Sequence, residues 1–333
     1  MEKKVVIQAQ DLCIGYRTGK KEKMVHEHLN FQLHAGELTC LLGANGAGKS
    51  TLLRTLSASQ PALDGNLSLL NKPLKDYSEK ERSRTIGVVL TDKTFAGGLT
   101  VYELIALGRQ PHTGFFGRLH KEDRLIIEKA MEDVGIAHKA KNYTAELSDG
   151  ERQKVMIAKA LVQECPLILL DEPTAFLDVV SRIEIMHLLH RLAVEQDKAI
   201  LLSTHDIEQA LVLSDKLWLL TKGKGLQYGV TEDLILNHHM DELFIHKDIK
   251  FDYDPGVYYP TVQGNKEIIV EASDKTLQHW VINALNRHGY QCQSAEATCD
   301  LHLKAVSHQE LLLTKKGETL VCSSFENMMG LLP

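Results

Sequence analysis

The chain has 333 residues, of which 44% are hydrophobic and 25% charged, and its formal net charge is -6. This length suits one large or two medium domains, and the composition is that of a globular protein without a tract that indicates disorder. The negative charge gives no electrostatic reason to expect nucleic acid as a partner. No run approaches the roughly 18 to 20 apolar residues that span a bilayer. The chain is therefore not expected to form a membrane pore by itself.

The N-terminal residues and the cysteines favour a cytosolic protein. The start, Met1–Val5, lacks the apolar stretch and the small-residue cleavage site of a secretory signal. The six cysteines form no CxxC pair, and several lie in apolar runs, so we expect reduced thiols that pack in the core. The adjacent pair His238-His239 has no cysteine or carboxylate at ligand spacing, so a solvated surface is favoured over a metal site.

Apolar runs alternate with helical stretches through most of the chain. Helices are expected from Lys49, at 101–107, at 121–134 and from Ser148 onward. This alternation predicts an α/β fold, in which helices cover a mostly parallel sheet with an antiparallel edge and an inserted helical subdomain occupies about 96–150. The expected strands lie at 5–8, 38–42, 86–90, 167–170, 199–202 and 216–220.

The tail is predicted to be a separate module. An expected helix at 240–246 is followed by a turn-rich break at 251–256, which we interpret as a domain boundary between 1–250 and 257–333. Ser273 or Asp274 can cap a helix at 275–288, and Gly289 suits its left-handed end. With strands expected at 267–271, 301–305, 310–314 and 318–323, and a hairpin turn at 315–317, the tail reads as a small α+β domain of unknown role.

A glycine-rich loop follows the expected strand at 38–42 and precedes the expected helix. Its pattern, GxxxxGKS, is typical of loops whose backbone N–H groups surround phosphate oxygens, because glycines permit close approach and unusual backbone angles. Lys49 is predicted to reach the terminal phosphates, Ser50 to bind Mg²⁺, and the helix dipole to attract the same anion. The residues expected to hold the nucleotide here are Gly43, Asn45, Gly46, Ala47, Gly48, Lys49, Ser50 and Thr51.

Two acids and a histidine follow later strands. Asp171 ends the apolar run at 167–170, from which a carboxylate can bind Mg²⁺, and Glu172 can act as a base toward water beside the γ-phosphate. A solvated turn is the alternative for such a pair, but Pro173 and the upstream loop favour the catalytic interpretation. His205 follows the strand at 199–202 and is expected to donate a hydrogen bond to the same phosphate.

The run Leu147–Glu151 has two interpretations. Ser148 and Glu151 have the S-x-x-E spacing of a capping box, which starts a helix. A helix start with Gly150 also exposes N–H groups to an anion. Taken alone the run favours capping, whereas beside a complete phosphate site it favours anion binding.

In this order, the glycine loop, Leu147–Glu151 and Leu167–Pro173 resemble the motifs of ATP-binding-cassette (ABC) proteins, over about residues 4–245. The resemblance implies an ABC-type P-loop ATPase core, with 1–250 as nucleotide-binding domain and with ATP and Mg²⁺ as ligands. It also implies a homodimer of cassettes paired head to tail, in which Ser148, Gly150 and Glu151 of one copy close over ATP held by the loop of the other.

The family pattern implies further site residues. Tyr16 is expected to stack on adenine, with an ordinary surface or core tyrosine as the alternative, and Asp178 to touch the partner's site. The run Gly98–Arg109 is similar to importers of ferric siderophores, haem and vitamin B12. Asp92 stands where the family usually has a glutamine that contacts magnesium, and as a carboxylate it is a third candidate metal ligand. Asp149 replaces the second glycine of the signature, which puts a negative charge near a polyanion.

These observations predict the ATPase subunit of an importer for a ferric siderophore, haem or cobalamin. Its expected partners are integral-membrane permease subunits and, indirectly, an external substrate-binding protein, and its expected place is the cytoplasmic face of the inner membrane. The alternative is a soluble ABC ATPase acting on nucleic acid or ribosomes, although the chain lacks the long coiled coils or second cassette of such proteins. A kinase that uses the loop is a third reading, but it leaves Leu147–Glu151 without a role.

Overall fold

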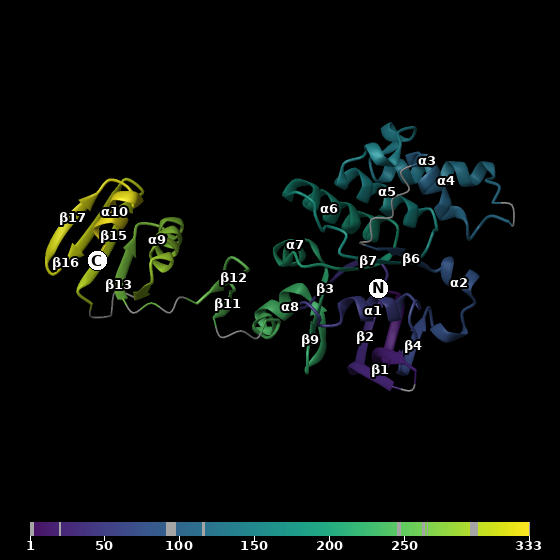
Figure 1. Cartoon of the computed structure of the whole chain (residues 1–333), viewed down its shortest axis with the longest axis horizontal. Helices are drawn as coiled ribbons and strands as arrows, with labels where there is room; N and C mark the ends of the chain where they lie inside the picture. The colour runs from purple at the N-terminus through teal and green to yellow at the C-terminus, as the bar shows by residue number, and fades with distance from the viewer. Residues whose placement is uncertain are drawn as a thin grey trace. The chain divides into compact units, whose positions relative to one another are not determined.

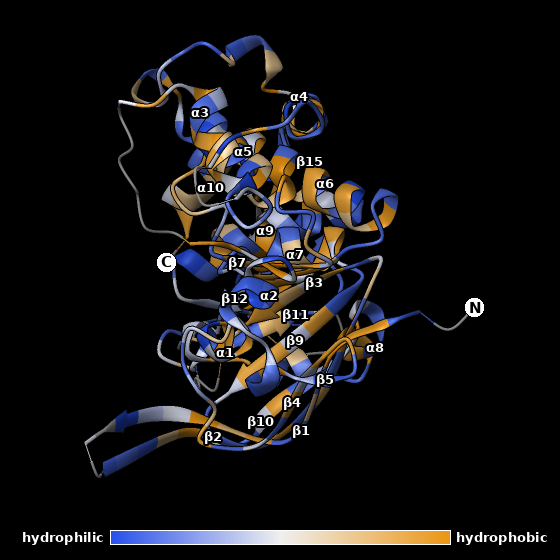
Figure 2. Ribbon diagram, turned by 90° about the vertical axis from the view of Figure 1, so that its right-hand side faces the viewer, coloured by the Kyte–Doolittle hydropathy of each residue, from blue (hydrophilic) through white to orange (hydrophobic). Residues whose placement is uncertain are grey.

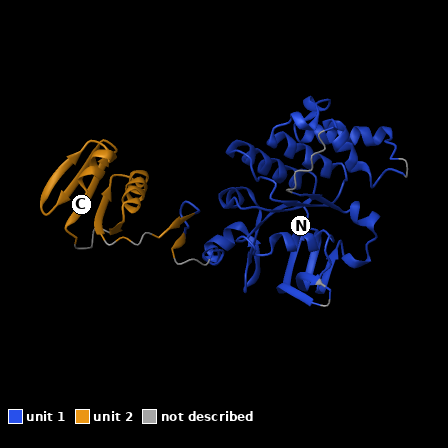
Figure 3. Cartoon of the chain, viewed as in Figure 1, with its two compact units in different colours: residues 1–245, 251–257 blue, residues 246–250, 258–333 orange. Residues whose placement is uncertain are grey.

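A computed structural model describes residues 3–19, 21–90, 98–114, 117–244, 248–261, 264, 266–293 and 299–332. The chain divides into two compact units, which are Met1–Ile245 with Phe251–Val257 and His246–Lys250 with Tyr258–Pro333 (Figure 3). Each unit has its own cluster of buried hydrophobic residues. Within the described residues, no helix combines the length and the apolar character needed to cross a membrane.

The centre of unit 1 is a six-stranded sheet with the order β10-β9-β3-β8-β7-β6. Four of these strands, β9, β3, β7 and β6, are labelled in Figure 1. Neighbouring strands run parallel except β10, which pairs antiparallel with β9. Every residue of β3 and β8 is buried, as expected for strands covered on both faces, and Figure 2 shows β3 and β7 in hydrophobic colours. This confirms the predicted mostly parallel sheet with an antiparallel edge. The strands are β3 (Glu37–Leu42), β6 (Ile86–Val89), β7 (Leu167–Asp171), β8 (Ala199–Ser203), β9 (Lys216–Thr221) and β10 (Gly225–Val230).

A second, antiparallel sheet in unit 1 has the order β2-β1-β4-β5. The sequence predicted only a short strand at 5–8, whereas β1 is much longer. Its pairing with β2 shifts register several times, as between Ala9 and Leu12, and Asp11 has a φ of 53°. Such bulges break the alternation of apolar and polar residues by which a long strand is recognised. The four strands are β1 (Val5–Thr18), β2 (Lys21–His34), β4 (Asp64–Leu69) and β5 (Lys72–Pro73).

Helices cover the parallel sheet and also form a separate group. The helices α3, α4 and α5 pack together in unit 1 (Figure 1), and a buried ion pair of 2.9 Å joins Arg109 Nε to Asp123 Oδ1 within this group. The predicted helices at 101–107 and 121–134 are thereby confirmed to within a residue. The helices of unit 1 are α1 (Lys49–Leu56), α2 (Glu79–Ser83), α3 (Val101–Ala106), α4 (Lys121–Asp133), α5 (Asp149–Leu161), α6 (Val179–Glu195), α7 (Ile207–Leu213) and α8 (Thr231–Leu236), with short 3₁₀ turns at Leu74–Asp76, Leu107–Arg109, Ala137–Lys139, Thr144–Glu146 and His239–Glu242.

Unit 2 contains a five-stranded sheet with the order β14-β13-β15-β16-β17. Asp274 caps α9 by accepting from the Leu277 backbone N–H at 2.8 Å, and Gly289 has a φ of 79°, as predicted. The helix expected at 240–246 is wrong, because only the single turn His239–Glu242 forms and 245–246 lie outside the described residues. The elements are β13 (Lys266–Ala272), α9 (Lys275–Arg287), β14 (Tyr290–Gln293), β15 (Leu301–Ser307), β16 (Glu310–Lys315), β17 (Glu318–Cys322) and α10 (Phe325–Leu331), while β11 (Ile249–Asp252) and β12 (Val257–Pro260) form a two-stranded ribbon.

Candidate functional site

The glycine loop joins β3, in the middle of the parallel sheet, to α1. Because β7 and β8 run parallel to β3, their carboxyl ends meet the loop at one edge of the sheet. Asp171 at the end of β7 is paired in register with Ser203 at the end of β8. Residues far apart in sequence are therefore brought together by the strand order alone.

At two glycines of the loop, a side chain would collide with neighbouring atoms. A Cβ on Gly43 would lie 2.6 Å from the carbonyl oxygen of Leu220, and one on Gly48 would lie 2.7 Å from Val25 Cγ1. Gly48 also has a φ of 102°, in the region that glycine adopts most readily. Within the described chain, the backbone N–H groups of Asn45, Gly46 and Gly48 have no protein acceptor. The loop is thus a set of unused donors at a helix start, which is the arrangement that binds phosphate.

The loop borders a pocket of about 600 Å³. Tyr16 stands at this pocket with its hydroxyl 2.6 Å from Thr51 Oγ1, and its side chain is partly exposed, so its ring is available to a ligand. Lys222, which the sequence did not single out, has its Nζ 3.6 Å from where a Cβ on Gly46 would lie. The lining comprises Tyr16, Lys23, Met24, Val25, Asn45, Gly46, Ala47, Gly48, Lys49, Ser50, Thr51, Glu172, His205 and Lys222.

Lys49 is buried at the base of this pocket, with 7% of its surface exposed. Its ammonium donates a hydrogen bond of 2.7 Å to the Gly43 carbonyl oxygen. Burial lowers the pKa of Lys49 below its ordinary value, and the nearby carboxylates of Glu172 and Asp171 partly oppose that effect. A buried ammonium that faces an open pocket is well placed to bind an anion.

The two acids and the histidine form a connected set at the carboxyl ends of β7 and β8. Ser203 Oγ donates to Asp171 Oδ1 at 2.6 Å and accepts from the Glu172 backbone N–H at 3.0 Å. His205 Nε2 lies 2.6 Å from Glu172 Oε1, so the imidazole holds the carboxylate directly. Glu172 has a φ of 49°, unusual for a residue with a side chain. Ser203 is not among the predicted site residues, because a serine at the end of an apolar strand carries no distinctive signal.

Ser148, Gly150, Glu151 and Asp178 form a second cluster and do not line the pocket of their own chain. Ser148 and Glu151 form the predicted capping box at the start of α5, with the Ser148 N–H 2.9 Å from Glu151 Oε2. A Cβ on Gly150 would lie 3.1 Å from Ser181 Oγ, and Asp178 Oδ2 accepts a hydrogen bond from that same hydroxyl. The starts of α5 and α6 therefore lie side by side.

Of the two positions that depart from the ABC pattern, the structure describes only Asp149. The carboxylate of Asp149 pairs with Arg152 Nη1 at 2.9 Å and is exposed. Its charge is therefore partly neutralised by the next turn of its own helix. Asp92 lies outside the described residues.

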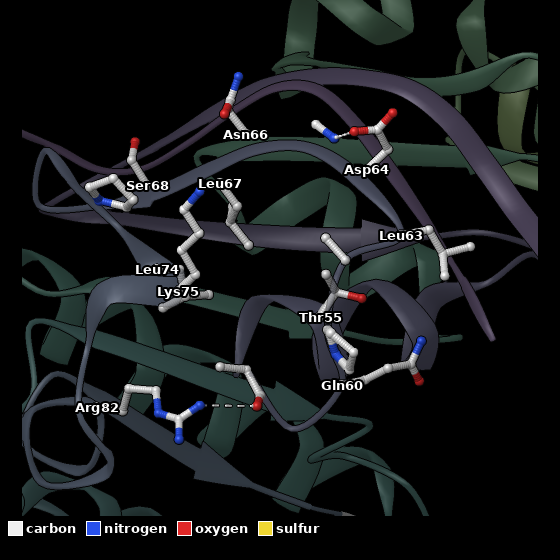
Figure 4. Close-up of a pocket in the computed structure, with 15 residues that line it drawn as sticks. Thr55, Gln60, Leu63, Asp64, Asn66, Leu67, Ser68, Leu74, Lys75 and Arg82 are labelled. Atoms are coloured by element: carbon white, nitrogen blue, oxygen red, sulfur yellow. Dashed lines mark hydrogen bonds between the residues drawn. The ribbon is translucent and has the colours of Figure 1, made fainter. Parts of the chain in front are cut away.

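A second pocket in unit 1, of about 630 Å³, lies between the end of α1, β4 and the turn after β5 (Figure 4). Its lining includes apolar side chains such as Leu67 and Leu74, with Gln60 and Arg82 at other points of the wall. The Arg82 guanidinium is directed to the Ala58 carbonyl oxygen at 3.5 Å. The residues of this pocket do not include a paired acid and base, so the loop pocket is the candidate active site.

Comparison with known proteins decides the family. The ABC transporter family model matches residues 26–175. The iron(3+)-hydroxamate import ATP-binding protein FhuC of Bacillus subtilis is 35% identical over 79% of this chain and 98% of its own length. The chain belongs to the ABC transporter ATP-binding proteins. The ferric enterobactin transport ATP-binding protein FepC of Escherichia coli is 36% identical over 72% of the chain and 86% of that relative. As a member of this family the chain is an ATP-binding subunit that hydrolyses ATP.

Solved structures of ABC proteins have the same fold. A metal-chelate type ABC transporter in an inward-facing conformation is 27% identical, with a TM-score of 0.62 over 77% of this chain and 95% of that chain. An ATP-binding cassette bound to ADP and Pi, dimeric and in a post-hydrolysis state, is 25% identical, with a TM-score of 0.59 over 68% of this chain and 98% of that chain. Both likenesses place the α/β architecture of unit 1 among the ABC ATPases.

Proposed function

We propose that this ABC ATPase powers the import of a ferric siderophore, haem or cobalamin through separate permease subunits at the cytoplasmic face of the inner membrane. The observation that carries the proposal is the meeting of the glycine loop, Lys49, Glu172 and His205 at one pocket, in a chain whose relatives are named as iron-chelate importers. A substrate-binding protein outside the membrane supplies the cargo, and nucleic acid is not a partner.

In this proposal the site residues divide into three groups, which bind adenine, the phosphates and Mg²⁺. Tyr16 stacks on adenine from the edge of the pocket. The loop N–H groups and the Lys49 ammonium bind the phosphates, where the buried charge meets an anion in a setting of low dielectric. The oxygens of Ser50 and Asp171, with Asp92, suit Mg²⁺, which prefers oxygen ligands and, when bound, neutralises charge on the phosphates.

Glu172 is the proposed base. Its carboxylate takes a proton from the water whose oxygen attacks the γ-phosphorus, while the bond to the bridging oxygen breaks and ADP leaves. The contact between His205 Nε2 and Glu172 Oε1 orients the carboxylate before nucleotide arrives. The same imidazole can then donate to the γ-phosphate.

Catalysis in this proposal requires two copies of the chain. Ser148, Gly150, Glu151 and Asp178 sit at neighbouring helix starts but away from their own pocket. A head-to-tail pair would let these helix starts close over the nucleotide of the other copy. The dimeric ADP-bound cassette among the similar structures supports this arrangement.

The proposed function is tested by reconstituting the chain with its permease in vesicles. ATP hydrolysis is measured with and without substrate-binding proteins loaded with ferric siderophore, haem or cobalamin. We expect one loaded binding protein to stimulate hydrolysis while the unloaded protein does not. Recovery of the chain only with ribosomes or DNA, and never with a polytopic membrane protein, would instead favour the soluble ABC ATPase.

A further inference from the structure

A buried histidine touches the glycine loop without a part in the chemistry proposed above. His26 lies on β2, has 5% of its surface exposed, and places Nε2 2.6 Å from the Ala47 carbonyl oxygen. The carbonyl can only accept, so the imidazole is the donor and carries its hydrogen on Nε2. The neighbouring β2 residues Val25 and Met24 line the pocket itself.

This hydrogen bond constrains one peptide group of the loop. The peptide between Ala47 and Gly48 is trans, so its C=O and N–H point in opposite directions. A hydrogen bond that holds the Ala47 carbonyl toward His26 therefore directs the Gly48 N–H away from His26. Among the described residues this N–H has no protein acceptor, and Gly48 lines the pocket.

The imidazole also supports the loop by contact. A Cβ on Gly48 would lie 3.2 Å from His26 Cδ2 and 3.3 Å from His26 Nε2, so the ring packs directly under the glycine whose φ is 102°. The packing of the ring and its hydrogen bond both constrain the backbone at Ala47 and Gly48. Together they restrict a segment that glycines would otherwise leave free to rotate.

We propose that His26 is a positioning residue for nucleotide binding, which holds the Ala47-Gly48 peptide so that the Gly48 N–H stays directed at the phosphates. The inference rests on the proposed nucleotide site. The proposal predicts that loss of this hydrogen bond weakens the affinity for ATP, because ATP must then order the loop as it binds.

The test compares three full-length variants by calorimetric titration with ATP and by steady-state hydrolysis. We expect His26→Leu to raise the Kd and KM for ATP about twofold to tenfold, the range of one net hydrogen bond, with a smaller change in kcat. His26→Gln keeps an N–H at the same reach and should restore most of the affinity. His28→Leu is the matched control, since His28 is an exposed histidine on the same strand.

Two outcomes would overturn the inference. One is a folded His26→Leu protein, with unchanged thermal unfolding, that binds ATP as tightly as the wild type. The other, which needs no variant, is a ¹⁵N NMR spectrum in which the His26 ring carries its hydrogen on Nδ1 rather than Nε2. Lys49→Met distinguishes failure of the His26 proposal from failure of the proposed nucleotide site. If Lys49→Met keeps full ATP affinity, the proposed nucleotide site itself is wrong.

Discussion

At the residue scale, Glu172 is held on both its backbone and its carboxylate. Its N–H donates to Ser203, its carboxylate meets His205, and its φ of 49° is maintained against the ordinary preference of a glutamate. Residues in sparsely populated backbone regions persist where the surroundings determine them, often at active sites. The position therefore has the character expected of a catalytic carboxylate.

Glu172→Gln keeps the size of the side chain and removes its basicity. We expect ATP hydrolysis to fall by about 10² to 10⁴, the usual contribution of a general base, while ATP still binds. Phosphate release and nucleotide titration measure the two effects. Glu208→Gln, an exposed acid of α7, serves as control and should hydrolyse ATP normally. Undiminished turnover in Glu172→Gln would show that the base has been misassigned.

Lys49 predicts a pH dependence of ATP binding. Burial lowers its pKa below the ordinary 10.5, and only the protonated ammonium attracts phosphate. The attraction is therefore complete at pH values below this lowered pKa and is lost as the pH rises through it, before 10.5 is reached. Titrations with ATP across the alkaline range should show the affinity falling, whereas Lys49→Met should bind weakly with little such dependence. An affinity that stays constant up to pH 10.5 would contradict the assignment.

At the element scale, the start of α5 has two possible duties, because capping and anion binding use the same end of a helix. Ser148→Ala removes the capping hydroxyl, for which we expect a loss of about 1 kcal/mol in the free energy of unfolding. Ser78→Ala makes the same change in the capping box of α2, which is remote in sequence from the motifs. If Ser148 also serves a nucleotide, its variant loses ATPase activity at equal stability and the Ser78 variant does not. Equal activity of the two variants would leave capping as the only role of Ser148.

The end of α9 in unit 2 depends on a left-handed glycine. Gly289 has a φ of 79°, which costs any L-residue with a Cβ roughly 1 to 2 kcal/mol. We expect Gly289→Ala to destabilise unit 2 by about that amount, seen as faster hydrogen exchange in α9 and β13. Gly330→Ala, inside α10 where nothing lies within 4 Å of the new Cβ, should leave the exchange of unit 2 unchanged or slower. Identical behaviour of the two variants would contradict the reason given for Gly289.

At the scale of the whole molecule, the proposed active site is incomplete in one copy. ATP should therefore trap a dimer when hydrolysis is blocked. In light scattering, Glu172→Gln with ATP is expected to double the mass of the 37.3 kDa chain, whereas the same protein with the added change Ser148→Arg stays monomeric. A Glu172→Gln protein that binds ATP and remains monomeric in the presence of its permease would exclude the shared site.

Much of the loop pocket was recognisable in the sequence because its parts are local. The spacing of Gly43, Gly48 and Lys49 is set by one loop, and Asp171 with Glu172 ends one strand. In each of these short segments, consecutive residues show both the chemical groups present and the strand or helix that carries them. By contrast His26, Lys222 and Ser203 carry no local signal, since each reaches the site from a different strand or turn.

The long hairpin of β1 and β2, which extends from unit 1 in Figure 2, shows the same limit at the level of elements. Bulges near Asp11 disrupt the alternation that identifies a strand, so only its first residues were predicted. On its other side the strand pairs with β4, which is distant in the chain, so no local window contains both of its partners.

The amino-acid sequence alone determined the α/β class, the family and the phosphate-binding loop, because these depend on hydrophobic period and on motifs a few residues long. Only the tertiary structure decided that His205 holds Glu172, that Ser203 joins the two acids, and that His26 supports the loop from β2. The first two contacts arise because β7 and β8 are neighbours in the parallel sheet, and the third arises because β2 of the antiparallel sheet meets the loop after β3. That neighbour relation follows from the packing of the whole unit and not from any single segment.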